Sequence, residues 1–272
     1  MYYFHIIKYL FFYKIIFLIR KFFFKEKIII NNSKKFIIEK HLSLLKKNGF
    51  SIIENYLDKN ECENIIKDMN DFYKKNISLI WTDKTNSEYR IHGAENVSKK
   101  IKDFFSDKML SLIGSSIFNG KMDNLMTMAN GIMFKNENVG SGGGWHRDGI
   151  EFQYKSILYL VDTNKDNGAF QLIDESNKFW VVIKDSIKNK INIFNTRFSE
   201  QIVNEIIKNK PDRLKTLEGK AGTLILVDTS AIHRGSPLKK GSRYALTNYY
   251  YPSYKIDSMK NHFTPKVNNI YY

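Results

Sequence analysis

The stretch GTLILVDTSAIHRGSPLKKGSRYALTNYYY occupies residues 222–251. It begins with an apolar run at 222–228 and ends with a tyrosine-rich run at 243–251. The segment between the runs contains Gly, Pro and Ser, which are residues that form turns. Short runs of this kind, separated by turn residues, are typical of β-strands. The stretch therefore predicts two strands connected by a polar turn.

Further strands are predicted upstream of this stretch. Apolar runs at 125–135, 153–162 and 168–173 are separated by clusters of Gly, Asn and Asp. Together with the runs at 222–228 and 243–251, these make five short apolar runs, and runs with this spacing predict a β-sandwich or barrel. Segment 184–218 interrupts the pattern, and we expect a helix within it at about 198–209.

Helical patterns dominate the chain before these strands. Apolar residues recur at helical spacing in 39–47, after Asp58, and in 99–118, with a short strand predicted at 50–53 and a polar loop at 82–98. The expected fold class is therefore α+β with a mainly β core.

The length of 272 residues favours one large domain with an added segment. We expect residues 1–36 to form that segment and 37–272 to form the domain, helical over 37–120, with its β core at about 121–255.

The N-terminal residues 1–24 are strongly apolar, but they include Lys8, Lys14, Arg20 and Lys21. A spanning helix needs about 20 mostly apolar residues, and lysines near its centre are costly. Two alternatives remain open for residues 1–27. They form either a basic, aromatic helix on an anionic membrane surface or a helix that packs on the domain.

The amino-acid composition restricts the classes of partner and the cellular compartment that we expect. The chain has 43 Lys and Arg against 28 Asp and Glu, but 36 of the 43 are lysine. Base recognition relies on the bidentate arginine side chain, so we expect no nucleic-acid partner. A single cysteine, Cys62, excludes a disulfide framework. We expect a cytoplasmic protein, at the inner face of the membrane if residues 1–27 bind lipid.

A metal-ligand pattern is present in the β region. His146 is the only histidine with a carboxylate two positions later, Asp148, and on a strand both side chains would face the same side. His233 follows the 222–228 strand. Two histidines and one carboxylate form the facial triad that suits non-haem Fe(II). Arg243, ten residues after His233, can bind a carboxylate in bidentate fashion.

From about residue 37 to 251 the chain resembles the phytanoyl-CoA dioxygenase family of Fe(II)- and 2-oxoglutarate-dependent oxygenases. The similar segments are 44–69, 132–149 with its Trp-His-Arg-Asp, 159–178, and the stretch quoted first. One segment departs from the family pattern, because Asp-Glu-Ser-Asn at 174–177 replaces a Pro-Gly-Ser-His run. This departure affects the expected local turn and leaves the metal ligands in place.

The resemblance implies a double-stranded β-helix, the jelly-roll or cupin-like fold, with flanking helices. It implies His146, Asp148 and His233 as catalytic iron ligands, Arg243 as the anchor for the distal carboxylate of 2-oxoglutarate, and O₂ as the oxidant. Halogenases of this family lack the carboxylate ligand, so Asp148 favours hydroxylation or a related oxidation. The expected substrate is a small molecule, a lipid or a glycan precursor.

Further site residues are expected from less specific patterns. Lys135 and Thr247 are expected near the co-substrate. Arg90 and His92 are expected in a loop that often lines the substrate pocket in this family, and Trp145 is expected to form a wall of the active site.

Two alternatives to this enzyme stay open. The first is a catalytically silent scaffold protein of the same family, associated with a membrane, which would retain no iron. The second is a cupin-like isomerase or a hydrolase that uses a different metal and acts without 2-oxoglutarate.

Overall fold

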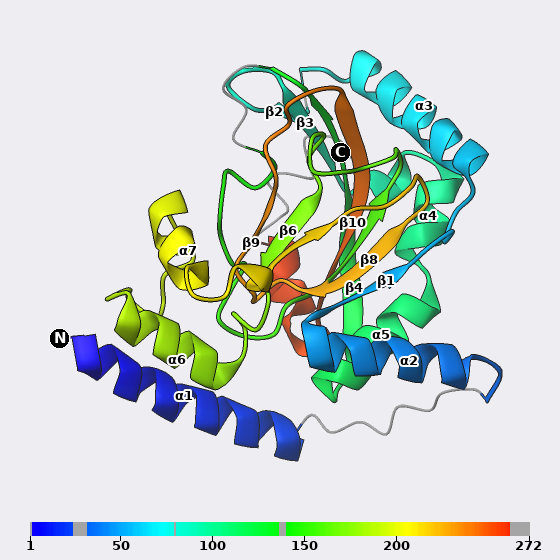
Figure 1. Cartoon of the computed structure of the whole chain (residues 1–272). Coiled ribbons are helices and arrows are strands. Elements are labelled where there is room, and N and C mark those ends of the chain that lie inside the picture. Colours follow the sequence, from blue (N-terminus) through cyan, green and yellow to red (C-terminus); the bar gives the residue numbers. More distant parts are fainter. Residues whose placement is uncertain (1, 24–31, 79, 136–139, 262–272) are drawn as a thin grey trace.

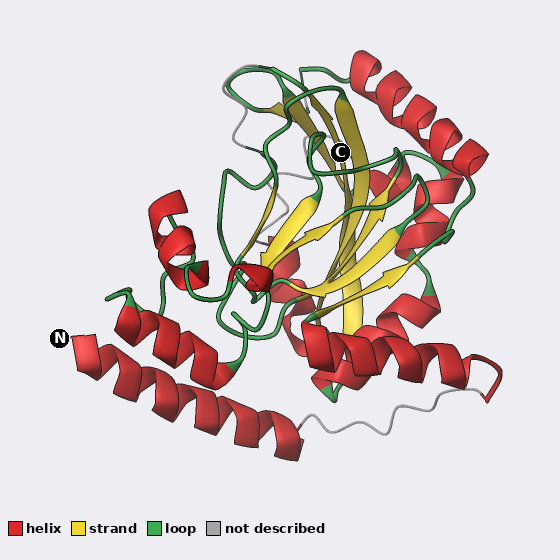
Figure 2. Cartoon of the chain, in the orientation of Figure 1, coloured by secondary structure: helices red, strands yellow, loops and turns green. Residues whose placement is uncertain are grey.

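Two antiparallel sheets form the centre of the molecule, with helices around them (Figures 1 and 2). The computed structural model describes residues 2–23, 32–78, 80–135 and 140–261. The larger sheet has seven strands and the smaller has three. This arrangement agrees with the α+β class and the mainly β core predicted from the sequence.

Both sheets pair strands that lie far apart in the sequence. The larger sheet contains, in spatial order, β1 (Phe50–Ile53), β8 (Leu224–Asp228), β5 (Tyr154–Tyr159), β10 (Ser242–Pro252), β4 (Met122–Met133), β3 (Glu88–His92) and β2 (Trp81–Thr82). The smaller sheet contains, in spatial order, β7 (Leu214–Leu217), β6 (Phe170–Ile173) and β9 (His233–Gly235).

The central strands of the larger sheet are buried on both faces. On β8, Leu224 and Leu226 belong to the core formed with the helices. Their neighbours Ile225 and Val227 belong to a second core that also contains Phe170 of the smaller sheet. Because successive side chains on a strand point to opposite faces, the smaller sheet must cover the face opposite the helices.

Four helices cover the outer face of the larger sheet (Figure 1). They are α2 (Asn32–Asn48), α3 (Lys59–Lys75), α4 (Lys99–Phe105) and α5 (Lys108–Phe118). Helix α3 begins with a capping box, in which Asp58 and Glu61 each accept a hydrogen bond from the other's backbone N–H. Its buried stripe of Cys62, Ile65 and Met69 faces the core.

Helices α1 (Tyr2–Phe23), α6 (Phe179–Lys188) and α7 (Glu200–Ile207) lie on the other side of the molecule (Figure 1). Short 3-10 helices complete the described elements: η1 (Ala94–Asn96), η2 (Pro211–Arg213) and η3 (Ser253–Lys255).

Helix α1 packs against α6 through one face. Ile6 and Tyr9 are buried in a cluster with Val182 and Ile183, and the Tyr9 ring stacks on Phe179 at 5.5 Å between centroids. This face of α1 therefore fits the alternative in which the N-terminal helix packs on the domain. Other apolar side chains of the described helix, such as Phe4, Ile7 and Phe11, are exposed. Within the described ranges, no helix is both long and apolar enough to cross a membrane.

Strands β4, β5, β6, β8 and β10 confirm the five predicted runs. The loop prediction for 82–98 was wrong, because this segment contains β3, whose polar Glu88 and Arg90 are paired with each other. Strand β7 was missed within the interruption, and α2 begins at Asn32, before the predicted helix start.

Candidate active site

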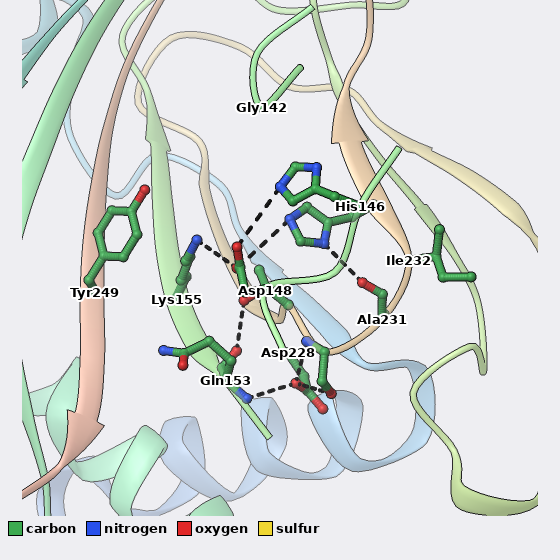
Figure 3. A network of polar contacts seen from close by, with 12 residues as sticks. Gly142, His146, Asp148, Gln153, Lys155, Asp228, Ala231, Ile232 and Tyr249 are labelled. Atoms are coloured by element: carbon green, nitrogen blue, oxygen red, sulfur yellow. Dashed lines mark hydrogen bonds and ion pairs between the residues drawn. The ribbon is translucent and has the colours of Figure 1, made fainter. Parts of the chain in front are cut away.

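Three side chains that could hold a metal ion converge in the space between the two sheets. One ligand atom each of His146, Asp148 and His233 lies within 4.8 Å of the others. The Nε2 atom of His146 is 3.9 Å from Oδ1 of Asp148, and Nε2 of His233 is 3.9 Å from Oδ2 (Figure 3). Two imidazole nitrogens and one carboxylate therefore face a common point.

The backbone fixes the spacing of the two histidines. The His146 N–H donates to the His233 carbonyl at 2.9 Å, and the His233 N–H donates to the His146 carbonyl at 2.7 Å. His146 makes only isolated bridges, so the prediction that His146 and Asp148 lie on a strand was wrong. The preceding glycines have positive φ values, which do not fit an extended strand. Instead, the Asp148 N–H donates to the Thr229 carbonyl at 3.0 Å and holds the carboxylate beside the rings.

Both rings are oriented by backbone carbonyls. Nδ1 of His146 lies 2.9 Å from the Gly144 carbonyl, and Nδ1 of His233 lies 2.9 Å from the Ala231 carbonyl. A carbonyl only accepts, so each Nδ1 donates and each Nε2 presents its lone pair to the shared point. Burial lowers the pKa of His146 and lowers the pKa of His233 to about 3. Both rings are therefore neutral at pH 7, as metal binding requires.

Lys155 on β5 is a site residue that the sequence reasoning missed. Its Nζ atom lies 2.6 Å from Oδ2 of Asp148 and 4.2 Å from the centre of the Tyr249 ring (Figure 3). Burial alone would raise the pKa of Asp148, but the charge of Lys155 acts together with other neighbours and hydrogen bonds to hold that pKa below its usual value. The available signal was a lysine inside an otherwise apolar run, since burying an unpaired ammonium is costly.

A cavity of about 220 Å³ opens beside the three ligand side chains. The larger sheet supplies one wall, where Thr247 lies directly opposite Met128 on β4 and Ile157 on β5. Asn130 also faces the cavity, and its side-chain oxygen and nitrogen are buried without a hydrogen-bond partner. Phe170 and His233 lie on the opposite wall, which comes from the smaller sheet.

Arg243 lies in the same cavity as a buried cation without an acid. It is 4% exposed, its guanidinium lies 5.6 Å from the centre of the Tyr159 ring, and its Nε has no hydrogen-bond partner. Among the described residues, no carboxylate forms an ion pair with it. Burial lowers its pKa from the ordinary arginine value. Thr247, four residues along the same strand face, also lines the cavity.

The remaining predicted residues are divided between the cavity and other places. Arg90 lines the cavity, with its Nε 2.6 Å from Oε1 of Glu88. His92 and Trp145 are buried but do not line it, and Trp145 donates through Nε1 to a carboxylate oxygen on α7. Lys135 is exposed, and its Nζ donates to the Thr85 carbonyl at 2.8 Å.

The glycine-rich segment before His146 forms part of the cavity lining. Gly142 has φ near 88°, and a Cβ atom there would lie 2.3 Å from Cε1 of His146. Only glycine therefore lets this segment lie against the histidine ring. The Gly142 carbonyl also accepts a hydrogen bond from Arg197, another cavity residue not predicted from the sequence.

Segment 174–177, where the sequence departs from the family pattern, supports the turn before His233. The Ser176 hydroxyl accepts a hydrogen bond from the Ile232 N–H at 2.7 Å. The Asn177 amide donates to Oδ2 of Asp228 at 2.8 Å, at the end of β8. These side chains hold the loop that carries His233, and a turn forms at 174–177 with residues that differ from the family pattern.

The donor set fits the iron that the resemblance implies. Two neutral imidazoles and one carboxylate, with an open side toward the cavity, form the ligand type that suits non-haem Fe(II). The unpaired guanidinium of Arg243 in the same cavity fits a small carboxylic acid.

The family model for phytanoyl-CoA dioxygenase (PhyH) matches residues 45–243. No curated protein sequence matches the chain.

Solved structures share the fold at low sequence identity. The epimerase SnoN, solved with Fe³⁺, alpha ketoglutarate and nogalamycin RO, is 11% identical with a TM-score of 0.58, covering 80% of this chain and 85% of SnoN. HygX from Streptomyces hygroscopicus, with nickel, 2-oxoglutarate and hygromycin B bound, is 15% identical with a TM-score of 0.54, covering 79% and 88%. The carbocyclase SnoK from nogalamycin biosynthesis is 10% identical with a TM-score of 0.57, covering 79% and 84%. These likenesses confirm the predicted jelly-roll fold.

Proposed function

Because the chain belongs to the phytanoyl-CoA dioxygenase family, we propose that it uses His146, Asp148 and His233 to hold Fe(II) and Arg243 to anchor 2-oxoglutarate. It is an iron- and 2-oxoglutarate-dependent enzyme. One observation carries the residue assignment: the three ligand side chains converge in a cavity that also holds a buried arginine without an acidic partner among the described residues. Bound 2-oxoglutarate would supply the missing negative charge.

Each proposed role follows from the contacts of the side chain. The carbonyls of Gly144 and Ala231 keep both Nε2 atoms directed at the metal position. Lys155 holds the Asp148 carboxylate ionised and fixes the direction of one of its oxygens. Such partners of ligand residues commonly affect metal affinity by about 10- to 100-fold.

Arg243 and Thr247 would orient the distal carboxylate of the co-substrate from one strand. A guanidinium can bind a carboxylate through two parallel hydrogen bonds, which fixes position as well as charge. Ile157 and Phe170 add apolar surface to the same cavity and limit the water beside the reacting groups. With O₂ and 2-oxoglutarate, bound iron supplies the oxidation of a substrate C–H bond, with release of succinate and CO₂.

The reaction we propose is hydroxylation, or a related oxidation, of a small molecule, a lipid or a glycan precursor. Asp148 supports this choice, because its carboxylate would take the ligand position that halogenases of the family leave to a halide. The proposal therefore predicts that the substrate is oxidised, and that the product contains no halogen, when halide salts are present.

The test is anaerobic binding of Fe(II) and 2-oxoglutarate to the full chain, followed through the metal-to-ligand charge-transfer absorption. We expect a visible band in the wild type, no band in His146→Ala, and a band in Arg243→Ala only at 2-oxoglutarate concentrations at least about tenfold higher. Lys67→Gln, on the exposed side of α3, is the matched control for loss of one charge.

Absence of the band in folded, metal-replete wild-type protein would contradict the proposal. The catalytically silent scaffold would then be the better description. Lys135→Met tests the remaining co-substrate prediction: an unchanged 2-oxoglutarate affinity would assign Lys135 to its loop contact with Thr85.

We also propose that α1 binds peripherally to an anionic membrane. Phe4, Ile7, Phe11 and Leu18 are each more than 60% exposed on this helix. The helix sequence contains four basic residues and no acidic one, and the Lys8 side chain is exposed. Exposed apolar side chains with basic neighbours suit the interface of anionic lipids. Such binding would place the chain at the cytoplasmic face of the membrane.

Vesicle sedimentation tests this association. Full-length chain should sediment with phosphatidylglycerol vesicles and much less with phosphatidylcholine vesicles, and added salt should weaken binding. Binding that is equal for both lipids, or self-association through α1 without vesicle binding, would contradict the proposal.

A further inference from the structure

The mouth of the active-site cavity carries positive charge that the proposed cofactors do not neutralise. We propose that the substrate presents an oxyanion, a phosphate or a carboxylate, which Arg197 binds at this mouth with help from Arg90. This inference rests on the proposed function, because it considers the charges that remain after iron and 2-oxoglutarate are bound.

The cavity is unusually rich in cations. Four basic residues line it, whereas Asp148 is the only acidic residue among its described lining. The basic residues come from three strands and one loop: Arg90, Lys155, Arg197 and Arg243. The ratio of basic to acidic residues is higher here than in the whole chain, which has 43 basic and 28 acidic residues. The general lysine bias does not explain it, because three of the four are arginines.

Two of these cations already have acidic partners. Lys155 lies 2.6 Å from Asp148, and Arg90 lies 2.6 Å from Glu88. Arg243 and Arg197 form no ion pair with an acid in the described part of the chain. Iron adds two positive charges and 2-oxoglutarate adds two negative charges, so the pair leaves this excess unchanged. With both bound, the site keeps a net excess of two positive charges, which favours a negatively charged substrate.

The two uncompensated arginines differ in depth. Arg243 is buried against Tyr159, where the proposed co-substrate lies. Arg197 is exposed, and the one hydrogen bond that its side chain makes with a described residue is donated to the Gly142 carbonyl at the rim. A guanidinium has five N–H donors, so Arg197 keeps donors for an incoming group. Arg197 is therefore the cation that a substrate meets from the solvent.

Arg197 is held close to the metal ligands by its backbone. Its residue pairs with His146 as an isolated antiparallel bridge. On either side, the Arg147 N–H donates to the Thr196 carbonyl at 2.9 Å, and the Phe198 N–H donates to the Trp145 carbonyl at 3.0 Å. An anion bound to Arg197 would therefore have a fixed position relative to His146, which is what substrate orientation requires.

The second mouth cation, Arg90, comes from the opposite wall. Its Nε is used by Glu88, and its guanidinium lies 4.6 Å from the centre of the Trp81 ring. Its terminal N–H groups form no hydrogen bond with a described residue and remain available. Arginine matches the oxygens of phosphate and carboxylate equally well through its planar fork.

The cavity is small, so we infer that the charged group of the substrate is recognised at its mouth. Its volume is about 220 Å³, whereas pockets that enclose drug-sized ligands are usually about 300–1,000 Å³. Since 2-oxoglutarate would share this space, only part of a substrate could enter. The charged group would remain near Arg197 while a neighbouring carbon reaches toward the metal ligands.

The test is calorimetric binding of small probes to the full chain, loaded anaerobically with Fe(II) and 2-oxoglutarate. The probes are glycerol 3-phosphate, 3-hydroxypropionate and uncharged glycerol. We expect at least one of the two anions to bind and glycerol to bind at least about tenfold more weakly. The anion that binds identifies the source of the oxyanion.

Substitutions of Arg197 distinguish an effect of its charge on anion binding from an effect on the local structure. In Arg197→Gln the anion should bind about 10- to 100-fold more weakly, because a charge-assisted contact is lost. Arg197→Lys should restore part of the affinity, and Lys67→Gln on α3 should bind like the wild type. Equal binding in the wild type and Arg197→Gln, or no preference for either anion over glycerol in the loaded wild type, would overturn the inference.

The loaded complex is verified by its charge-transfer band before each titration. A missing band in the wild type would contradict the proposed function itself. A normal band without anion selectivity would contradict only the substrate inference.

Discussion

The β8 strand and helix α1 place apolar side chains in opposite environments. Every residue of β8 is buried between the helices and the smaller sheet. On α1, Ile6 and Tyr9 are buried, whereas Phe4 and Phe11 are more than 60% exposed. The cavity shows the reverse mismatch, because it places cations inside the protein. Buried charge and exposed apolar surface are the two features that packing alone does not explain. We therefore propose that both features mark surfaces that bind a partner, a ligand in the cavity and lipid on α1.

The largest effect on stability is expected in the core. Leu226→Ala removes a fully buried side chain from β8, between β1 and β5. We expect the free energy of unfolding to fall by about 3–4 kcal/mol, from lost burial and the cavity left behind. Urea unfolding of the metal-free protein measures it. A loss below about 1 kcal/mol would show that β8 is no better packed than α1.

The buried histidine gives the next largest effect. His233 has a pKa of about 3 in the fold and an ordinary value of 6.5. Below pH 6.5 the His233 side chain takes up a proton in the unfolded chain but not in the folded chain. The contribution of this group to the free energy of unfolding is therefore complete above pH 6.5 and falls as the pH drops toward 3. Between pH 7 and 5, this group alone should cost about 2 kcal/mol.

Urea unfolding of metal-free protein at pH 7, 6 and 5 measures this dependence. His233→Gln cannot take up the proton and should lose this part of it. A wild-type unfolding free energy that stays constant over this range would contradict the assigned burial of the neutral ring.

A smaller effect is expected where α1 contacts the domain. Tyr9→Ala removes the ring that stacks on Phe179 and is only 3% exposed. We expect α1 to detach locally at a cost of about 1–3 kcal/mol, because one aromatic contact face is lost while the two sheets stay intact. Hydrogen exchange should increase in residues 2–23 and remain slow in β8. Loss of protection in both regions would show that they unfold as one unit.

The smallest effect on stability is expected at the exposed face of the same helix. Phe11→Ser should change the free energy of unfolding by less than about 0.5 kcal/mol, because the ring contacts solvent already. The same substitution should reduce binding to phosphatidylglycerol vesicles. Unchanged vesicle binding would remove the functional reason for this apolar surface.

Much of the central fold could be predicted from the sequence because β5, β8 and β10 lie in runs rich in apolar and aromatic residues, with clear turn residues between them. Strand β3 could not, because its polar residues are stabilised by a mutual ion pair that is visible only after folding. The helix in the interruption, α7, was predicted near its observed position from its apolar periodicity.

The proposed site could be predicted in part for a similar reason. The spacing of His146, Asp148, His233 and Arg243 is a sequence pattern, and the fold brings all four to one cavity. Lys155 belongs to no such pattern, since its position depends on how β5 faces Asp148. Arg197 reaches the cavity through backbone pairing with a distant loop, which no local periodicity encodes.

The paired backbones of His146 and His233 also determine when the proposed iron site could form during synthesis. During synthesis, His146 and Asp148 leave the ribosome long before His233 does. Until the segment with His233 has been made and its N–H and carbonyl have paired with those of His146, the nascent chain offers only two of the three ligands. Iron capture at the proposed site would therefore be a late step in maturation, and incomplete chains that end before β9 would not present the complete proposed ligand set.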